Sequence, residues 1–354
     1  MRHLLPVQVR VKHTNAMIRI TGRIDVNRIR LGVAALLMIS LGAAATGQDK
    51  SRFELKIEKD KAFYQMMRTD VTQIIKVQGQ DLTQKQDSTF YFKWTPEKQD
   101  GDKWQLKQKI EGLKMNIDIS GNPISYDSTK KDQPGSAGNP GLMDFFKNLE
   151  GAEFGVTLNT KTWAVEKVDG KDDFVKKLGA GNAQMDSLLK KIMTDDALKQ
   201  MADPTHNLIP DAAKGANETW EKKQTLGLGP IGSYEVAYKF TYKGKDAAKK
   251  HLDRIEVGTT LTYKPPVGDT DGLLFKIKDG KITSKDSKQT SYVLYNAATG
   301  RVEEAKIFLE LRGDLTVVIG GTESKVELDQ TQVTTIEGGN ETFLKTDAAA
   351  PPKK

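Results

Sequence analysis

The chain has 354 residues, with 54 Lys and Arg against 47 Asp and Glu, a formal net charge of +7, and no cysteine. The absence of cysteine excludes disulfide scaffolds, thiol catalysis, cysteine-ligated zinc and iron–sulfur sites. Hydrophobic residues make up 37% of the chain and charged residues 29%, which is typical of a globular protein rather than a membrane bundle or a disordered chain.

The first 45 residues have the pattern of an export signal. Leu31–Ala45 is an uncharged apolar run that follows Arg19, Arg23, Arg28 and Arg30 and precedes a polar stretch. Its fifteen residues are fewer than the roughly 20 that cross a bilayer as a helix. Small residues at Ala43 and Ala45 match a signal-peptidase site. We therefore predict a signal peptide over residues 1–45, cleaved after Ala45 or Gly47, and an exported mature chain that is periplasmic or extracellular. An uncleaved N-terminal anchor is the alternative, and Met17 is an alternative start to Met1.

Most of the positive charge lies in this predicted signal. Residues 1–45 contain seven basic side chains and one acid, so their removal leaves 47 basic against 46 acidic residues. The remaining basic residues alternate with acids and form no positive stripe with interleaved aromatics. We therefore expect no nucleic-acid partner, and contact with a membrane only through the signal segment.

Alternating apolar and polar residues predict antiparallel strands in two parts of the chain, residues 46–130 and 216–340. In the first part the predicted strands are Arg52–Glu58, Thr89–Thr95 and Trp104–Ile119, with a hairpin turn at Asp100–Asp102. In the second part they are Tyr234–Tyr242, Ile255–Tyr263, Leu273–Lys278, Ser291–Tyr295, Arg301–Leu311, Leu315–Ile319 and Lys325–Thr335. A disordered tail is expected over 341–354.

Residues 131–215 predict a loop, a hairpin and a helical insert. Lys130–Gly141 is rich in Pro and Gly, and helices are expected at about 142–150 and 171–202. Thr194 is the expected cap of the last helix. The hairpin Val156–Gly170 has a faint counterpart in Val293–Ile307, which raises a duplication as a hypothesis. In that comparison Gly300 supplies a positive φ in the second copy, and Thr162 is taken as its equivalent.

These elements predict an α+β fold. Its main part is a large curved antiparallel β-sheet, half-barrel-like, with a few helices packed against it. If the counterpart hairpins reflect a true duplication, the sheet consists of two related halves.

The layout resembles an exported bacterial family that is known only as a domain of unknown function. The matching stretches are residues 89–104, 121–129, 178–205, 218–220 and 228–235. The resemblance spans roughly 50–336 and implies no reaction, because its motifs are structural. The layout is also similar to that of LolA/LolB periplasmic lipoprotein carriers, in which helices plug an apolar cavity of an incomplete barrel. This second similarity is an analogy of layout alone.

No motif for catalysis or metal binding is found in the mature chain. His206 and His251 lack metal-ligand neighbours, and no G-x-S-x-G motif is present. The paired aspartates at 100/102, 172/173 and 195/196 are explained by turns and helix termini. The glycines of Gly227–Gly232 lead into a strand rather than a helix, unlike a phosphate-binding loop. We expect no enzyme activity and no cofactor.

Apolar helical residues are the candidate ligand site. They are Met185, Leu188, Leu189, Ile192, Met193, Leu198, Met201, Phe145 and Phe146. Methionine adapts to irregular apolar partners, so this surface suits a lipid or another apolar ligand held in the concavity of the sheet. The residues could equally cover the sheet as ordinary core. The alternative function is an envelope structural or protein-interaction module with a solid core, an envelope protein partner and no small ligand.

Overall fold

The computed structural model describes residues 50–130, 140–180, 183–203, 208–227, 231–266 and 276–345. The chain divides into two compact units between Thr46 and Gly47, and all described residues belong to the second unit. The predicted signal peptide, most of the predicted loop, His206 and residues 346–354 lie outside the described residues.

The described chain is an α+β unit with one large antiparallel sheet and four helices, which confirms the predicted fold class. In chain order the elements are β1 (Phe63–Val77), β2 (Gln80–Asp100), β3 (Lys103–Ile119), β4 (Asn122–Asp127), α1 (Pro140–Leu149), β5 (Glu153–Asn159), β6 (Val165–Asp169), α2 (Lys171–Gly179), α3 (Ala183–Ile192), α4 (Asp195–Met201), β7 (Thr219–Gly227), β8 (Ser233–Lys245), β9 (Asp253–Lys264), β10 (Lys276–Ser284), β11 (Ser291–Asn296), β12 (Arg301–Ile319) and β13 (Thr322–Gly339).

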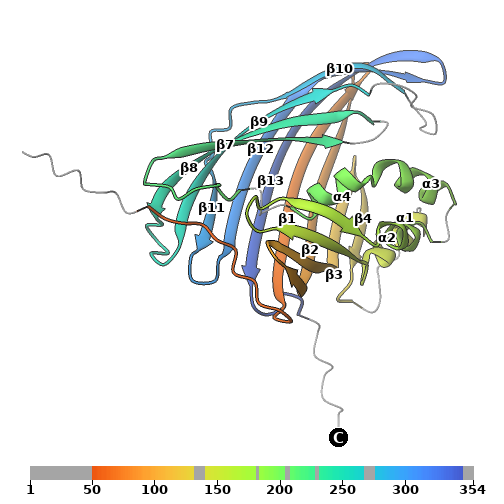
Figure 1. Ribbon diagram of the computed structural model, residues 1–354. Helices are drawn as coiled ribbons and strands as arrows, with labels where there is room; N and C mark the ends of the chain where they lie inside the picture. The colour runs from red at the N-terminus through yellow and green to blue at the C-terminus, as the bar shows by residue number, and fades with distance from the viewer. Residues whose placement is uncertain are drawn as a thin grey trace, which may run out of the picture. The chain divides into compact units, whose positions relative to one another are not determined.

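The sheet brings the first and last strands of the chain together in its middle. Its strand order is β6-β5-β3-β2-β1-β13-β12-β10-β9-β8-β7, with β4 paired to β3 and β11 paired to β9 and β12. Figure 1 shows β1, in orange, beside β13, in blue. The two strands at the ends of this order, β6 and β7, both contact α4. The curvature of the sheet thus brings both of its ends to the same short helix.

One face of the sheet, which we call the inner face, carries the apolar cores. Side chains alternate between the two faces of a strand, and the residues of β1 with odd numbers lie on the inner face. A first core joins Phe63 and Trp94 to residues of all four helices, including Phe146 and Leu198. A second core surrounds Phe240 and a third contains Leu311. The helices therefore cover one end of the inner face.

The helical insert has the predicted Thr194 cap, and its helices lie close to the predicted ranges. Thr194 is the N-cap of α4, and its side chain accepts a hydrogen bond from the backbone N–H of Ala197 at 3.2 Å. Lys171 pairs with Asp195 at 2.5 Å, which connects the start of α2 to the start of α4. The expected helices over 142–150 and 171–202 are thus observed as α1 and as three short helices.

The two counterpart hairpins share a local structure. Asn159 Oδ1 accepts hydrogen bonds from the backbone of the residues two and three positions later, and its Nδ2 donates to Glu166. Asn296 does the same, with Nδ2 donating to Glu303. The positive φ lies four residues after each asparagine, at Trp163 (61°) and Gly300 (66°). The predicted equivalence of Gly300 with Thr162 was therefore wrong by one residue.

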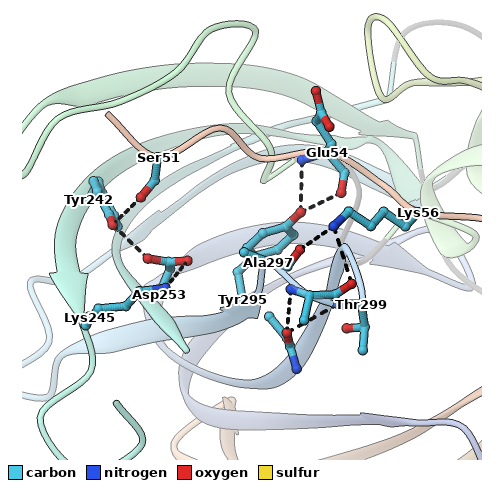
Figure 2. Close-up of polar contacts among 11 residues, drawn as sticks. Ser51, Glu54, Lys56, Tyr242, Lys245, Asp253, Tyr295, Ala297 and Thr299 are labelled. Carbon is cyan, nitrogen blue, oxygen red and sulfur yellow. Dashed lines mark hydrogen bonds and ion pairs between the residues drawn. The ribbon is translucent and has the colours of Figure 1, made fainter. Parts of the chain in front are cut away.

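Arg52–Glu58 is not a strand, although its side chains alternate. Its backbone is bound by side chains instead, as Figure 2 shows. The Tyr295 hydroxyl contacts both the N–H and the carbonyl of Glu54, and Lys56 Nζ donates to the Ala297 carbonyl at 2.8 Å. Phe53 is buried in the second core. The alternation therefore shows that one side of this extended segment is buried, although its backbone forms no β-ladder with a neighbouring strand.

A second difference is that Arg301–Leu311 and Leu315–Ile319 form one continuous strand, β12. Arg312–Asp314 reads as a turn, but Gly313 lies within the strand, opposite Ile282 of β10. A Cβ atom at position 313 would overlap the backbone of Lys281 and Ile282. The glycine thus permits the close approach of two strands and makes no turn.

Candidate functional site

The predicted helical residues lie mainly in the first core. Phe146, Leu189 and Leu198 are buried there, and Leu198 is completely shielded from solvent. The partly buried ones that pack against this core are Phe145, Met185, Ile192 and Met193. Met201 is 46% exposed. The side chain of Leu188 lies outside the described residues. The structure therefore brings most of these residues together, but as a packed helix–sheet interface.

The groove beside these helices is polar at its rim. A groove of about 790 Å³ between α2 and α3 is lined by Lys171, Asp172, Lys176, Asp186 and Lys190, with Val175 and Met193 among its apolar members. Charged side chains at the opening do not match a purely apolar ligand. The described helices include none long and apolar enough to span a bilayer.

The inner face of β1, β2, β12 and β13 has a different character. Over most of these strands, every residue on the same side as the cores is uncharged. This holds for Phe63–Val77, Gln80–Trp94, Ala305–Ile319 and Thr322–Ile336. They are Phe63, Gln65, Met67, Thr69, Val71, Gln73, Ile75, Val77, Gln80, Leu82, Gln84, Gln86, Ser88, Phe90, Phe92, Trp94, Ala305, Ile307, Leu309, Leu311, Gly313, Leu315, Val317, Ile319, Thr322, Ser324, Val326, Leu328, Gln330, Gln332, Thr334 and Ile336. An uncharged surface spanning four neighbouring strands is thus available on this face.

The outer face of the same strands is charged. Arg68 contacts Asp70 at 3.1 Å and Asp87 at 2.5 Å, and Asp329 accepts from Lys285 at 2.9 Å. Partial burial raises the pKa of Asp87, and a hydrogen bond with Asp70 raises it further, against the opposing charge of Arg68. Within the ranges given above, the charged side chains of these four strands therefore lie on the outer face.

Uncharged polar residues form a band across the inner face, which we call the amide band. Its members are Thr69, Gln73, Gln84, Gln86, Ser88, Gln330, Gln332 and Thr334. Along β13, Gln330 Nε2 donates to Gln332 Oε1 at 3.3 Å, and Gln332 Nε2 donates to Thr334 Oγ1 at 3.2 Å. Thr334 Oγ1 lies 3.3 Å from Thr69 Oγ1 on β1. Gln330, Gln332, Thr334 and Thr69 therefore form a connected set of hydrogen-bonding groups within the band.

Most of the amide band is only half-buried. Gln73, Gln86, Gln330, Gln332 and Thr334 are all partly accessible to solvent. The apolar residues in the same rows of β12, Ile307 and Leu309, are also half-buried. By contrast, Phe63 and Trp94 at one end of the inner face are buried in the first core. The middle of the inner face therefore remains partly open to a ligand.

A second polar cluster joins the segment after the predicted signal to β8 and β9 (Figure 2). Ser51 Oγ lies 2.6 Å from the Tyr242 hydroxyl, which donates to Asp253 Oδ1 at 2.7 Å, and Lys245 contacts the other carboxylate oxygen at 3.0 Å. Burial raises the pKa of Tyr242 to about 12. Tyr242 therefore keeps its proton at neutral pH and acts as a hydrogen-bond donor rather than as a base.

The described part of the chain contains no cluster of three or more His, Asp or Glu that could hold a metal ion. His251 lies 3.7 Å from Glu303 with a side chain that is 67% exposed. This geometry is that of a surface contact between two exposed polar side chains.

Sequence reasoning missed the amide band because it missed β1. In β1 the inner-face positions alternate between apolar residues and Gln65, Thr69 and Gln73, so the apolar periodicity is interrupted. A usable signal was present in the neighbouring strand: in Gln80–Ser88, the first part of β2, charged residues occur only at odd positions. The alternation of charged with uncharged positions, rather than of polar with apolar ones, identifies this part of β2.

Comparison with solved structures gives only weak overlaps. Lipovitellin overlaps with a TM-score of 0.40 and 10% identity, over 84% of this chain and 27% of that chain. The chain thus spans about a quarter of the length of that protein. DynF from the dynemicin biosynthesis pathway of Micromonospora chersina overlaps with a TM-score of 0.20 and 8% identity, over 85% of this chain and 89% of that chain. An outer membrane channel from Pseudomonas putida F1 overlaps with a TM-score of 0.21 and 8% identity, over 82% of this chain and 99% of that chain. None of these overlaps establishes a shared fold.

No curated protein matches the sequence. A family model matches residues 101–302, from the start of β3 to the start of β12. This range covers more than half of the chain and includes the helical insert, in agreement with the family resemblance expected from the sequence. The chain therefore belongs to a family of unknown function, DUF6263.

Proposed function

We propose that this protein is an exported, non-enzymatic binding protein that holds an apolar or lipid-like ligand on the inner face of its curved sheet. The observation that carries the proposal is the absence of charged side chains at the inner-face positions of Phe63–Val77, Gln80–Trp94, Ala305–Ile319 and Thr322–Ile336. A solvent-exposed sheet face is ordinarily populated by charged residues, as the outer face of these strands is.

The location differs from the one expected from the sequence. The helical residues around Leu198 support the wall of the site by packing into the first core. The ligand would instead contact the half-buried residues in the middle of the sheet, such as Val71, Ile307 and Leu309. Burying these apolar side chains under a ligand contributes about 25 cal/mol for each Å² removed from water.

Two measurements test the proposal. Gently purified protein is extracted with organic solvent and the extract is examined by mass spectrometry for co-purified lipid. The protein is also titrated with Nile red, a neutral apolar dye whose fluorescence rises in apolar surroundings. We expect saturable dye binding. If no lipid co-purifies and dye binding does not saturate, the proposal is wrong.

A matched pair of variants locates the site. Val71 is half-buried on the inner face, and Thr72 is its exposed neighbour on the outer face of β1. Val71→Lys places a charge where the ligand would lie and should weaken dye binding at least about tenfold, because an unpaired charge resists desolvation. Thr72→Lys should leave binding unchanged. Circular dichroism and thermal unfolding establish that both variants are folded.

The packed helix–sheet interface favours a second candidate function, a structural or protein-interaction module. Leu198 and Leu178 are almost fully shielded, which leaves little room for a ligand at that end of the sheet. Cross-linking in the native envelope would identify a protein partner. A specific cross-linked partner together with failed dye binding would favour this alternative.

Export has its own test. We propose that the mature chain begins after Ala45 or Gly47, a few residues before Ser51, which pairs with Lys214 and contacts Tyr242. N-terminal sequencing of protein recovered from an extracytoplasmic fraction would identify the cleavage site. Recovery of the uncleaved chain in the membrane fraction would instead indicate an anchor.

A further inference from the structure

We infer that the ligand is an uncharged amphiphile, in which an acyl chain carries a neutral hydrogen-bonding group such as a glycerol ester, rather than a fatty acid or a phospholipid. This inference rests on the proposed function and specifies the ligand class of the same site. It is carried by the order of side chains along the inner face.

The register arranges the inner face as apolar, polar and apolar zones along the strands. The amide band occupies three successive rows, which run from Ser88, Thr69 and Thr334 to Gln84, Gln73 and Gln330. On one side of the band the next row is Phe90, Met67 and Ile336; on the other side it is Leu82, Ile75 and Leu328. With about 3.3 Å per residue along a strand, the three rows extend over roughly 13 Å. A ligand on this face thus meets hydrogen-bonding groups between two apolar surfaces.

The chemistry of the amide band matches a neutral head group. A glutamine side chain both donates and accepts hydrogen bonds, and a hydroxyl does the same. Such groups can accept from the hydroxyls of a glycerol moiety and donate to an ester carbonyl. The half-buried side chains of Gln73, Gln86 and Gln332 lie within this band. They can therefore replace the hydration of an uncharged polar group.

The same surface does not suit an anionic head group. A carboxylate or phosphate that leaves water needs a paired positive charge to offset its lost hydration. The inner-face positions of Phe63–Val77, Gln80–Trp94, Ala305–Ile319 and Thr322–Ile336, which include the amide band, carry neither lysine nor arginine. Arg301, at the start of β12, lies over the ring of Phe63 at the end of the face, away from the amide band. Other basic residues of these strands, such as Arg68, Lys76 and Arg312, lie on the outer face. An anionic lipid would have to keep its head group in solvent, outside the amide band.

The test compares three ligands that share one acyl chain. Nile red bound to the full-length mature protein is displaced by 1-monolauroylglycerol, by laurate or by ethyl laurate, at about pH 8, where laurate is ionised. We expect monolauroylglycerol to displace the dye at a concentration at least about tenfold lower than laurate. Ethyl laurate, which lacks hydroxyl donors, should fall between the two.

A pair of variants connects this preference to the amide band. The double variant Gln330→Leu/Gln332→Leu removes two amides from the inner face, and Thr331→Leu changes the exposed residue between them on the outer face. The double variant should weaken monolauroylglycerol about tenfold, as expected for the loss of one or two hydrogen bonds. It should weaken ethyl laurate less, because ethyl laurate shares the ester carbonyl but lacks the hydroxyls that donate to the amides. Thr331→Leu should change neither.

The outcomes separate this inference from the proposed function. If the dye does not bind at all, the proposed function fails. If the dye binds but laurate displaces it as well as monolauroylglycerol does, only the inference on ligand class is overturned. The inference is also overturned if the double variant retains its full preference for monolauroylglycerol over ethyl laurate.

Discussion

The hydroxyl of Tyr295 binds the backbone of Glu54 twice: it accepts a hydrogen bond from the N–H at 2.9 Å and donates one to the carbonyl at 2.5 Å. Burial raises the pKa of Tyr295 to about 12, so the hydroxyl remains protonated and able to donate at neutral pH. These contacts join two segments 241 residues apart. They fix the beginning of the described chain to β11, which pairs with β9 and β12.

Replacing Tyr295 with phenylalanine should release this segment. Tyr295→Phe leaves two backbone groups of Glu54 without their partner, so we expect a loss of about 1–3 kcal/mol in the free energy of unfolding. Urea unfolding measures this loss, and limited proteolysis should show faster cleavage within residues 50–58. The control is Tyr292→Phe, whose hydroxyl donates to Glu304 instead. Equal proteolysis of the two variants would contradict the assigned role of Tyr295.

Two residues of α4 distinguish a structural role from a surface role. Leu198 is completely buried in the first core, whereas Met201 is 46% exposed. Leu198→Ala should lower the free energy of unfolding by about 2–5 kcal/mol because it opens a cavity. Met201→Ala should change it by less than about 0.5 kcal/mol. Chemical denaturation of both variants provides the comparison, and similar losses would show that the burial of α4 differs from that described.

Gly313 should tolerate no side chain. Gly313→Ala places a methyl group against the backbone of Lys281 and Ile282 in β10. The backbone of these two residues can move away only if β10 separates from β12. We expect a loss of about 1–3 kcal/mol or more, measured by thermal unfolding. Gly258 is the control, because a Cβ there would make only ordinary contacts, the nearest at 3.7 Å from the Lys239 carbonyl oxygen. Gly258→Ala should be neutral or stabilising by up to about 1 kcal/mol. An unfolding temperature for Gly313→Ala equal to that of the parent would refute the close approach.

Glu304 should contribute to acid sensitivity. Hydrogen bonds from Lys249 and then from Tyr292 lower the pKa of Glu304 below its ordinary value of 4.5. In the unfolded chain this carboxylate binds protons more readily, so its stabilising contribution is complete above pH 4.5 and is lost as the pH falls through the lower, folded value. The free energy of unfolding, measured from about pH 3 to about pH 7, should therefore fall less steeply with acid in Glu304→Gln. Lys249→Met should act in the same direction, because it removes the largest cause of the shift.

The sequence was most informative where one strand face is continuously apolar. Tyr234, Val236, Tyr238 and Phe240 alternate without interruption, and they predict β8 well. Arg52–Glu58 shows the same pattern, yet its hydrogen-bond partners are side chains such as Tyr295, whose proximity depends on the folded chain. Alternation reports which side of a segment is buried and leaves open what binds its backbone.

The candidate site could not be found from a single sequence, because its residues become neighbours only through the register. Thr69 and Thr334 share a row although 265 residues separate them. Within β1 alone, Thr69 and Gln73 look like solvent-facing residues. Only the pairing of β1 with β13 shows that they lie on the same side as the apolar cores.

The contact of α4 with both β6 and β7 has a mechanical consequence. Adjacent strands in a ladder are held about 4.8 Å apart by their backbone hydrogen bonds, but the ends of this sheet are joined by a helix of seven residues. One of its links to β7 is a hydrogen bond from the Gln200 side chain to the Thr225 carbonyl. Side-chain packing on α4, rather than a backbone ladder, therefore connects β6 to β7. The spacing between these two strands can change without breaking any strand pairing. It depends instead on the size of a few residues of α4.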